Sequence, residues 1–259
     1  MIRVLVVGAG GRMGATLVRQ IGASDALRLS AALDQAAHPA LGKEIAPGVA
    51  LGADLRAACA LADVAIDFSS PESTAALVDE AEAKGVPLVI GTTGLDASAE
   101  SRIERAAARL AIVRTANFSI GATVLLELVA EAARRLEGYE IEVLEMHHDQ
   151  KRDAPSGTAL SLAGAAAAAR GHTLAHSAVY ARHGLTGVRD PKSIGIQALR
   201  LGDSVGEHTV YFAGPGERVE LAHRALSREN FAAGALRAAR WLVGRGPGLY
   251  TMRDVLRPT

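Results

Sequence analysis

The segment from His147 to Ala159 holds the side chains of this sequence that are best suited to chemistry. It contains two adjacent imidazoles, a lysine ammonium at position 151 and the run Ser156-Gly157-Thr158. An imidazole can donate a proton near neutral pH, and an ammonium can donate a proton or stabilise negative charge. The Ser-Gly-Thr run predicts the start of a helix, and the first backbone N–H groups of a helix bind anions. The segment therefore indicates an active site for a small acidic substrate.

The two histidines are expected to lie on opposite sides of a strand. If Glu140–His148 is extended, its side chains alternate, so that His147 shares a face with Glu145 and His148 points to the other side. Neighbouring histidines arranged in this way cannot easily share one metal ion, and no cysteine or third histidine lies at a ligand spacing, so we expect no metal site. We assign no chemistry to five scattered histidines: His172, His176, His183, His208 and His223.

A glycine-rich turn near the start of the chain indicates a dinucleotide cofactor. The apolar run Ile2–Val7 is followed by Gly8-Ala9-Gly10-Gly11-Arg12-Met13-Gly14. Glycine is needed in such a turn because the chain bends sharply and its backbone approaches a pyrophosphate closely, while the next helix presents N–H groups to the phosphates. The spacing departs from G-x-G-x-x-G, since position 13 is methionine, so the turn alone would be weak evidence.

Asp34 strengthens the cofactor prediction. It follows the expected strand Leu27–Leu33, where such a fold places the acid that binds the adenosine ribose hydroxyls. The next residue is Gln35 rather than arginine, and a carboxylate about 4 Å from a phosphate charge costs on the order of a few kcal/mol. We therefore expect NADH to be preferred over NADPH, with Arg12 as the one local charge that would allow some NADPH use.

Two further loops complete the expected cofactor site. Gly91–Gly94 follows the apolar run Pro87–Ile90, and Thr115–Phe118 ends the run Ala111–Thr115. Both would lie at the carboxyl ends of parallel strands, where open α/β sheets bind ligands, and we expect them to face the nicotinamide end. The expected cofactor-binding residues are Gly8, Ala9, Gly10, Gly11, Arg12, Met13, Asp34, Gly91, Thr92, Thr93, Thr115, Ala116, Asn117 and Phe118.

The elements that would position these residues change character near the middle of the chain. The first half predicts strands at Ile2–Val7, Leu27–Leu33, Val64–Phe68, Pro87–Ile90 and Ala111–Thr115, separated by helical stretches that include Ser73–Lys84 and Ser98–Arg109. This alternation implies a parallel, doubly wound α/β sheet. The second half predicts helices at Ile120–Leu136, from Ser156 to about Arg170 and at Arg228–Val243, strands and long loops over Ser177–Arg224, and a short tail after a Gly-Pro-Gly turn.

Composition limits the class of partner. Lys and Arg total 28, Asp and Glu total 28, and no basic stripe is visible, which argues against a nucleic-acid binder. The single cysteine, Cys59, allows no internal disulfide and fits a reducing compartment. The N-terminal apolar run ends at Gly8 and is too short for a signal sequence or a membrane span. We expect a cytoplasmic protein with neither a nucleic-acid nor a membrane partner.

The whole chain resembles the 4-hydroxy-tetrahydrodipicolinate reductase (dihydrodipicolinate reductase) family. The most specific motif is the histidine–lysine–Ser-Gly-Thr signature, and the others support it. The matching motifs are Gly8-x-x-Gly11-Arg12-Met13-Gly14, Asp67-Phe68-Ser69-x-Pro71-Glu72, Gly91-Thr92-Thr93-Gly94, Ala116-Asn117-Phe118-Ser119, Glu145-x-His147-His148-x-x-Lys151-x-Asp153-Ala154-Pro155-Ser156-Gly157-Thr158-Ala159, Gly206-Glu207-His208-Thr209 and Met252-Arg253-Asp254-Val255-Leu256.

The resemblance implies a fold and a reaction. It implies a Rossmann-type domain formed by residues 1–118 and 229–259, and an α+β mixed-sheet domain at 119–228 that binds substrate and forms a homotetramer. It also implies NAD(P)H-dependent reduction of a cyclic dicarboxylate imine, 4-hydroxy-tetrahydrodipicolinate, to tetrahydrodipicolinate in lysine and diaminopimelate biosynthesis. Some relatives carry an arginine in place of Gln35, which bears on NADPH use but not on the reaction.

The resemblance also implies roles for the residues of the histidine segment. His147 would donate the proton, and Lys151 would be a second donor or a cation that stabilises developing negative charge. His148 would face one substrate carboxylate. Ser156, Gly157 and Thr158 would hold the other carboxylate, using backbone N–H groups at the start of the following helix.

Two other functions are compatible with part of these features. The first is another nicotinamide-dependent reductase, such as an imine- or amino-acid-forming dehydrogenase, but the Ser-Gly-Thr run beside the histidine and lysine favours a dicarboxylate. The second is a non-catalytic NAD-sensing regulator. It would need a DNA-binding or docking element, and the zero net charge and the lack of a helix-turn-helix pattern argue against it.

Overall fold

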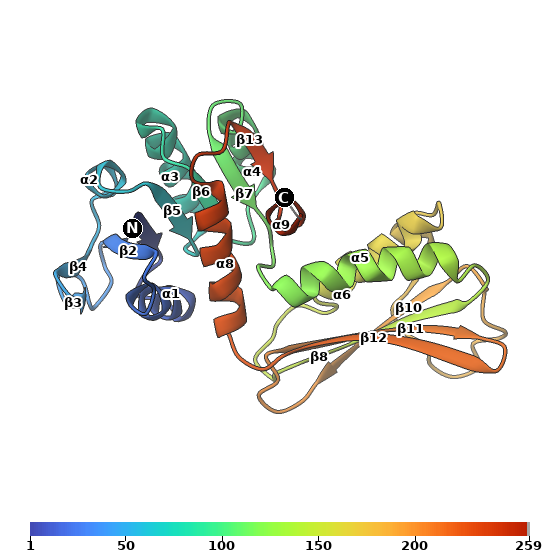
Figure 1. Ribbon diagram of the computed structural model, residues 1–259. Coiled ribbons are helices and arrows are strands. Elements are labelled where there is room, and N and C mark those ends of the chain that lie inside the picture. The colour runs from blue at the N-terminus through green and yellow to red at the C-terminus, as the bar shows by residue number, and fades with distance from the viewer. Residues whose placement is uncertain (258–259) are drawn as a thin grey trace. The chain divides into compact units, whose positions relative to one another are not determined.

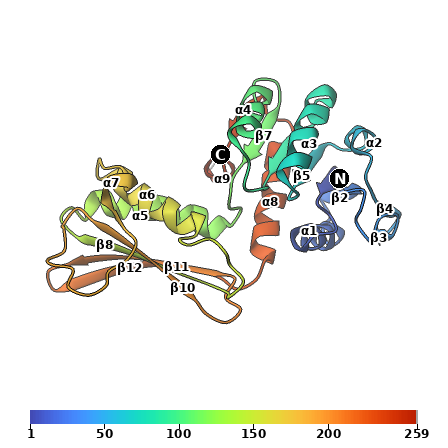
Figure 2. The same ribbon diagram turned by 180° about the vertical axis from the view of Figure 1, so that it is seen from behind.

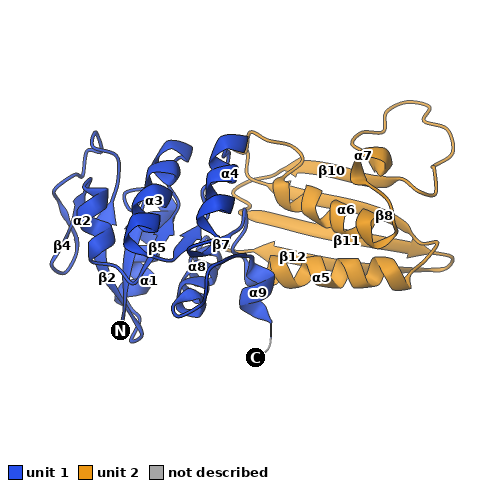
Figure 3. Cartoon of the chain, turned by 90° about the horizontal axis from the view of Figure 1, so that it is seen from above, with its two compact units in different colours: residues 1–120, 228–259 blue, residues 121–227 orange. Residues whose placement is uncertain are grey.

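The computed structural model describes residues 1–257, which form two compact units (Figure 3). Unit 1 contains residues 1–120 and the C-terminal segment from Arg228, whereas unit 2 is the continuous stretch Gly121–Ser227. Unit 2 is therefore inserted between the two parts of the chain that build unit 1. The last two residues of the expected range 229–259 lie outside the described residues.

Unit 1 is built on an eight-stranded sheet with the order β13-β7-β6-β5-β1-β2-β4-β3. Its strands are β1 (Ile2–Val7), β2 (Leu27–Leu33), β3 (Glu44–Ala46), β4 (Val49–Gly52), β5 (Val64–Asp67), β6 (Leu88–Ile90), β7 (Ala111–Arg114) and β13 (Gly248–Tyr250). Neighbouring strands are parallel except for β3 and β4. The central residues of β1, Val4 to Val6, are fully buried, which explains the continuous apolar sequence of this strand.

Helices cover both faces of this sheet (Figure 1 and Figure 2). They are α1 (Arg12–Gly22), α2 (Leu55–Ala60), α3 (Pro71–Lys84), α4 (Ala97–Ala106), α8 (Glu229–Leu242) and α9 (Met252–Leu256). Val4 and Val6 of β1 belong to an apolar cluster with α1, α8 and α9, whereas Leu5 and Val7 belong to a second cluster with α2, α3 and α4. Because alternate residues of one strand face two helical layers, the fold is doubly wound α/β, which confirms the predicted class.

Local sequence specifies where several of these helices begin and end. The hydroxyl of Ser70 accepts a hydrogen bond from the N–H of Ser73, and Pro71 occupies the first position of α3. Asp96 caps α4 in the same way, through the N–H of Ala99. Gly85 ends α3 with φ at 69°, in the left-handed region that favours glycine.

The C-terminal segment differs from the short tail that the sequence predicted. After α8 the chain adds β13, which pairs in parallel with β7, and then α9. Helix α8 packs tightly against the end of the first segment, since a Cβ added at Gly234 would lie 1.8 Å from the carbonyl oxygen of Phe118. The hairpin β3–β4 and the helix α2 were also not predicted, because such short elements carry too little hydrophobic periodicity.

Unit 2 is built on a five-stranded mixed sheet with the order β12-β11-β8-β10-β9. Its elements are α5 (Ile120–Arg135), β8 (Glu140–His147), α6 (Gly157–Ala169), α7 (Leu174–Ser177), β9 (Ala178–Val179), β10 (Ile194–Arg200), β11 (Gly206–Gly214) and β12 (Glu217–Ala225). Strand β8 is parallel to β10 and antiparallel to β11. Helices α5 and α6 lie along one face of the sheet (Figure 1) and share an apolar cluster with it. The predicted mixed sheet is confirmed.

Strand β8 has the alternation that the sequence predicted. Val143, Glu145 and His147 are buried, and the residues between them are partly exposed. Glu145 lies opposite His208 of β11 in the antiparallel register, so the buried face carries polar side chains at this end of the sheet. No helix within residues 1–257 is long and apolar enough to cross a membrane.

Candidate active site

The glycine turn of unit 1 is as compact as its sequence predicted. Gly8 has φ at +79°, and a Cβ added there would lie 2.3 Å from the carbonyl oxygen of Phe68. A Cβ on Gly14, in the first turn of α1, would lie 2.1 Å from the carbonyl oxygen of Gly8. Both positions therefore require glycine, because the turn, the helix and the loop after β5 are in backbone contact. Ala9 is buried under the turn, whereas Arg12 is exposed at the first position of α1.

Asp34 is hydrogen-bonded directly to this turn. One oxygen of its carboxylate accepts the N–H of Gly10 at 2.9 Å, and the other accepts the N–H of Gln35 at 2.9 Å. A cavity of about 500 Å³ opens beside these residues. It is lined by Val7, Gly8, Gly11, Leu33, Asp34, Gln35, Ala36, Ala53, Leu55, Phe68, Ser69, Ser70, Ser73 and Ala76. A bare backbone turn, a fixed carboxylate and an apolar wall fit the adenosine half of a dinucleotide.

His38 also lies at this turn, a position that no sequence motif predicts. A Cβ added at Gly10 would lie 2.5 Å from the Nε2 atom of His38 and 3.0 Å from the Asp34 carboxylate. The Nδ1 atom of His38 accepts the N–H of Ala40 at 3.2 Å, which leaves Nε2 on the side of the glycine turn. His38 stands in a loop with no motif around it, so its position depends on how that loop folds back.

The buried carboxylate of Asp67 connects the loop after β5 to the loop after β6 through hydrogen bonds. Asp67, at the end of β5, is fully buried and accepts hydrogen bonds from the hydroxyls of Ser69, Thr74 and Thr92. Burial raises the pKa of the Asp67 carboxyl, and these hydrogen bonds oppose that rise. The Thr92 hydroxyl is thus used inside the protein, while Thr93 beside it is exposed.

The loop after β7 is held by its own side chains. The Thr115 hydroxyl donates to the carbonyl of Asn117 at 3.1 Å, and the Asn117 side-chain oxygen accepts the N–H of Ser119 at 2.8 Å. Phe118 is 1% exposed, and its ring packs against that of Phe68. The Phe118 side chain is therefore inaccessible to a ligand, whereas Ala116 is exposed.

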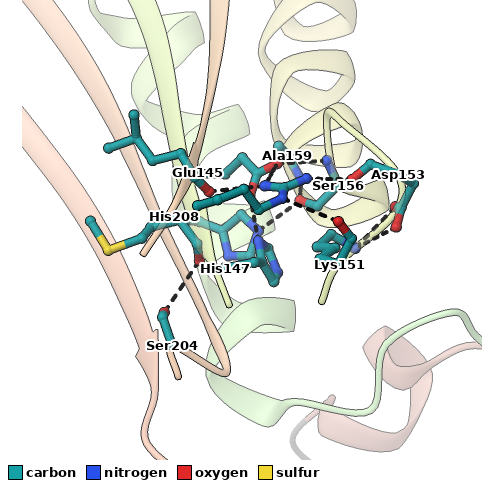
Figure 4. A network of polar contacts seen from close by, with 11 residues as sticks. Glu145, His147, Lys151, Asp153, Ser156, Ala159, Ser204 and His208 are labelled. Carbon is teal, nitrogen blue, oxygen red and sulfur yellow. Dashed lines mark hydrogen bonds and ion pairs between the residues drawn. The ribbon is translucent and has the colours of Figure 1, made fainter. Parts of the chain in front are cut away.

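In unit 2, Glu145 connects His147 to the start of α6 (Figure 4). Its carboxylate is fully buried, and one oxygen accepts a hydrogen bond from the Nδ1–H of His147. The other oxygen accepts the N–H of Ser156 at 3.0 Å and lies 3.5 Å from the guanidinium of Arg200. The sequence signature contained Glu145, but no role had been inferred for it.

His147 is a buried imidazole whose Nδ1 is held by the hydrogen bond to Glu145. Burial lowers its pKa, and the hydrogen bond and the charge of Glu145 act in the opposite direction. The charges of Lys151 and Arg200 add to the lowering. A Cβ added at Gly206 would lie 2.9 Å from the Nε2 atom of His147, so a glycine at this position leaves space beside that nitrogen.

Lys151 and its loop are fixed by two charged neighbours. The Lys151 ammonium donates to both oxygens of Asp153, at 2.8 and 3.0 Å, and its side chain is 18% exposed. The Arg200 guanidinium donates to the backbone carbonyl of Asp153 at 2.6 Å and to that of Lys151 at 3.4 Å. Arg200 was not predicted to contribute to the site, because it lies far along the chain on β10.

Ser156 caps α6 and contacts His208, one of the five histidines to which the sequence pattern assigns no chemistry. Its hydroxyl accepts the N–H of Ala159 at 3.1 Å and lies 2.9 Å from the Nε2 atom of His208. Burial lowers the pKa of His208 to about 3, so this imidazole is neutral at physiological pH. Its ring meets that of His147 edge-on, with centroids 5.2 Å apart. His208 therefore belongs to this site, although the sequence pattern assigns it no chemistry.

The remaining expected substrate residues lie around the same segment. Gly157 and Thr158 form the first turn of α6, with Gly157 exposed. The backbone N–H of His148 donates to the carbonyl of Ser204 at 2.8 Å, and its ring Nδ1 is buried without a hydrogen-bond partner among the described residues. Within residues 1–257, no group of three or more histidine, cysteine, aspartate or glutamate side chains could hold a metal ion.

These two units define a class of protein. Unit 1 is a Rossmann domain with a glycine turn, an acid, Asp34, that is hydrogen-bonded to this turn, and an adjoining cavity. Unit 2 contains the buried imidazole of His147, the ammonium of Lys151 and the start of α6. The combination is that of a pyridine-nucleotide-dependent reductase.

Comparison with known proteins gives the family. The family model described as dihydrodipicolinate reductase, N-terminus, matches residues 2–118, and that described as dihydrodipicolinate reductase, C-terminus, matches residues 121–256. The chain belongs to the dihydrodipicolinate reductase family, and it is an oxidoreductase.

Similar proteins span nearly the full chain. The 4-hydroxy-tetrahydrodipicolinate reductase of Anaeromyxobacter dehalogenans is 50% identical over 264 residues, covering 99% of this chain and 98% of the relative. That of Thiobacillus denitrificans is 48% identical over 262 residues, covering 98% of both. Among solved structures, a dipicolinate-bound dihydrodipicolinate reductase from Paenisporosarcina sp. TG-14 superimposes with a TM-score of 0.79 at 26% identity, covering 99% of this chain and 100% of that chain.

Proposed function

We propose that this chain reduces 4-hydroxy-tetrahydrodipicolinate to tetrahydrodipicolinate, using a nicotinamide nucleotide as reductant. The observation that carries the proposal is the buried Glu145–His147 pair beside Lys151 and the start of α6. It combines a proton donor with a binding site for a carboxylate. Relatives about half identical to this chain bear the name of that reductase, and the similar solved structure holds dipicolinate, a planar cyclic dicarboxylate.

The turn and the loops of unit 1 would hold the cofactor, which supplies the hydride when bound. The backbone of Gly8 to Gly11 and the first turn of α1, with Arg12 and Met13, would contact the phosphates, because three of the four residues of the turn are glycines. Asp34 would bind the adenosine ribose and favour NADH over NADPH. The loops that begin at Gly91 and Thr115 would contact the nicotinamide end.

The first turn of α6 would hold one substrate carboxylate. Its backbone N–H groups point out of the helix end, and the helix dipole adds a partial positive charge there. Ser156, which is fixed by Glu145 and His208, positions Gly157 and Thr158 for this contact. His148 would meet the second carboxylate, because it follows His147 directly at the end of β8.

His147 would supply the proton. Loss of water from 4-hydroxy-tetrahydrodipicolinate gives a conjugated imine. Addition of a hydride to this imine leaves an electron-rich enamine, whose carbon then takes a proton to give the reduced ring. The imidazolium of His147 gives up this proton from Nε2, because Nδ1–H is engaged by Glu145. Lys151 places a positive charge beside His147, where it stabilises developing negative charge or provides a second proton.

The sheet of unit 2 supports the further proposal of a homotetramer. Helices α5 and α6 cover one face of the sheet (Figure 2), and the residues that alternate with the buried ones point to the other face. Leu199 of β10, on that face, is 42% exposed. Light scattering of the purified protein should give four times the chain mass, and a Leu199→Arg variant should lower it.

The test of the reaction is NADH oxidation by the purified protein, followed with substrate freshly generated by the preceding enzyme of the pathway. We expect turnover with this substrate and none with monocarboxylate cyclic imines, because these lack the second group for the start of α6 or for His148. Faster turnover of a monocarboxylate imine would identify a different reductase. NADH binding without turnover of any cyclic imine would support a regulator.

A further inference from the structure

Glu145 is an acidic side chain that is hydrogen-bonded to both His147 and Ser156. It lies two residues before His147 on the buried face of β8, and its carboxylate is fully inaccessible to solvent. One oxygen is used by the His147 ring and the other by the backbone of Ser156 (Figure 4). A buried carboxylate is costly unless both oxygens are satisfied, and here each has a specific partner.

We propose that Glu145 is a positioning residue that sets both the tautomer of His147 and the start of helix α6. A single carboxylate would thereby fix the direction of proton donation and the place of carboxylate binding. This inference rests on the proposed function for its catalytic consequence, whereas its structural content concerns the free protein alone.

The first half of the argument concerns the imidazole. A carboxylate can only accept a hydrogen bond, so the proton on Nδ1 of His147 stays on the side of Glu145. The exchangeable position is then Nε2, which faces the backbone of Gly206. Carboxylates that hold one nitrogen of a functional histidine commonly orient the ring and raise the basicity of the other nitrogen.

The charges around His147 show why this carboxylate is needed. Two cations, Lys151 and Arg200, and the neutral ring of His208 face the imidazole, and Asp153 is engaged with Lys151. Burial and both cations disfavour the imidazolium, whereas Glu145 offers it a direct ion pair. Without that anion, His147 would not hold the proton that it must donate.

The second half of the argument concerns the helix. The N–H of Ser156 donates to Glu145 at 3.0 Å, immediately before the first residue of α6. The Ser156 hydroxyl is then left for Ala159 and His208. The backbone of the residue that caps α6 is therefore bound to the strand that carries His147. The loop between them is held by Arg200, whose guanidinium donates to the backbone carbonyls of Lys151 and Asp153.

The central experiment is an NMR titration of His147, with ¹⁵N-labelled histidine and no ligand. In the native protein the neutral ring should be the Nδ1–H tautomer. In Glu145→Gln, which keeps the side-chain shape and removes the charge, the pKa of His147 should fall by about one to three units. Glu140→Gln, at the exposed start of the same strand, should leave the titration unchanged.

The catalytic consequence has a separate readout. In Glu145→Gln, kcat should fall roughly 10- to 100-fold, and the limb of the kcat/KM profile that reports the imidazolium should move to lower pH. Glu145→Asp, which restores the charge, should recover part of both effects. An Nε2–H tautomer in the native protein, or an unchanged His147 pKa in a folded Glu145→Gln, would overturn the inference. Both NMR measurements can be made without substrate, so they test this inference even if the proposed substrate is not turned over. The tautomer of His147 is measured in the native protein and requires no variant.

Discussion

The Asp34 carboxylate accepts a hydrogen bond from the backbone N–H of Gly10 at 2.9 Å, although the two residues lie 24 positions apart. This contact joins the end of β2 to the turn between β1 and α1. The acid is therefore fixed beside the turn by the protein itself, and its negative charge cannot easily swing away from an added phosphate.

The first prediction concerns the choice of cofactor. We expect kcat/KM to be higher with NADH than with NADPH, because the fixed Asp34 carboxylate repels a 2′-phosphate. Asp34→Ser should reduce the ratio by about tenfold, since a repulsion of roughly 1.4 kcal/mol corresponds to that factor. Initial rates with both nucleotides measure it. A tenfold preference of the native enzyme for NADPH would contradict this assignment.

The second prediction concerns the proton donors. His147→Gln and Lys151→Ala should each lower kcat, by about 10² to 10⁴ for His147, the usual effect of removing a general acid. Circular dichroism should show that both variants remain folded. A variant that keeps more than about a third of native kcat with its fold intact would not have the role given to it here.

The third prediction concerns the space beside His147. Gly206→Ala should reduce kcat by about 100-fold, because a methyl group 2.9 Å from Nε2 must displace the ring, and a shift of about 1 Å has an effect of this size. Gly216→Ala is the matched control, since Gly216 also has a positive φ, at +80°, and nothing lies within 4 Å of its added Cβ. Equal kcat in the two variants would show that Nε2 does not need this space.

The fourth prediction separates helix capping from substrate binding. Ser156→Ala and Asp96→Ala each remove the cap of a helix and should each cost about 1 kcal/mol of unfolding free energy. Only Ser156→Ala should also raise KM, by roughly fivefold, because it releases His208 and loosens the start of α6. If KM is unchanged in Ser156→Ala, the first turn of α6 does not hold substrate.

The fifth prediction follows from the low pKa of His208. Its folded value is about 3, below the ordinary value of 6.5, so the unfolded chain binds a proton that the folded protein excludes. This contribution to stability is fully present above pH 6.5 and is lost as the pH falls toward 3, by at most about 1.4 kcal/mol per pH unit.

Denaturant unfolding at several pH values tests this. His208→Gln places an amide near the position of Nε2 and cannot titrate. The unfolding free energy of this variant should fall less steeply than that of the native protein between about pH 7 and pH 5. An identical slope in both proteins would mean that His208 is not buried in its neutral form.

The sequence predicted the elements with strong local patterns. The apolar run of β1, the glycine turn after it and the alternation of β8 each follow from residues that are close together in the chain. The hairpin β3–β4, helix α2 and strand β13 were missed because none of them is a purely apolar run like β6, which is equally short. Their formation depends on a neighbouring strand or layer that is already in place.

Two residues of the site in unit 2, His208 and Arg200, could not be predicted from local sequence patterns. His208 lies 52 residues after Ser156, and Arg200 belongs to β10, so both reach the histidine segment only through the pairing of β8 with its neighbours. A signal was present for His208, because it alternates with Val210 and Phe212, which are both fully buried. A histidine on the buried face of a strand must find a partner.

The insertion of unit 2 within unit 1 has a consequence for synthesis of the protein. One apolar layer of unit 1 combines Leu17 of α1 with Ala235 and Leu242 of α8, which are made at opposite ends of translation. When residues 1–120 leave the ribosome, this layer still lacks α8, whereas unit 2 is a continuous stretch that can fold as it emerges. Unit 1, whose first residues are made first, therefore cannot complete this layer until α8 has been made.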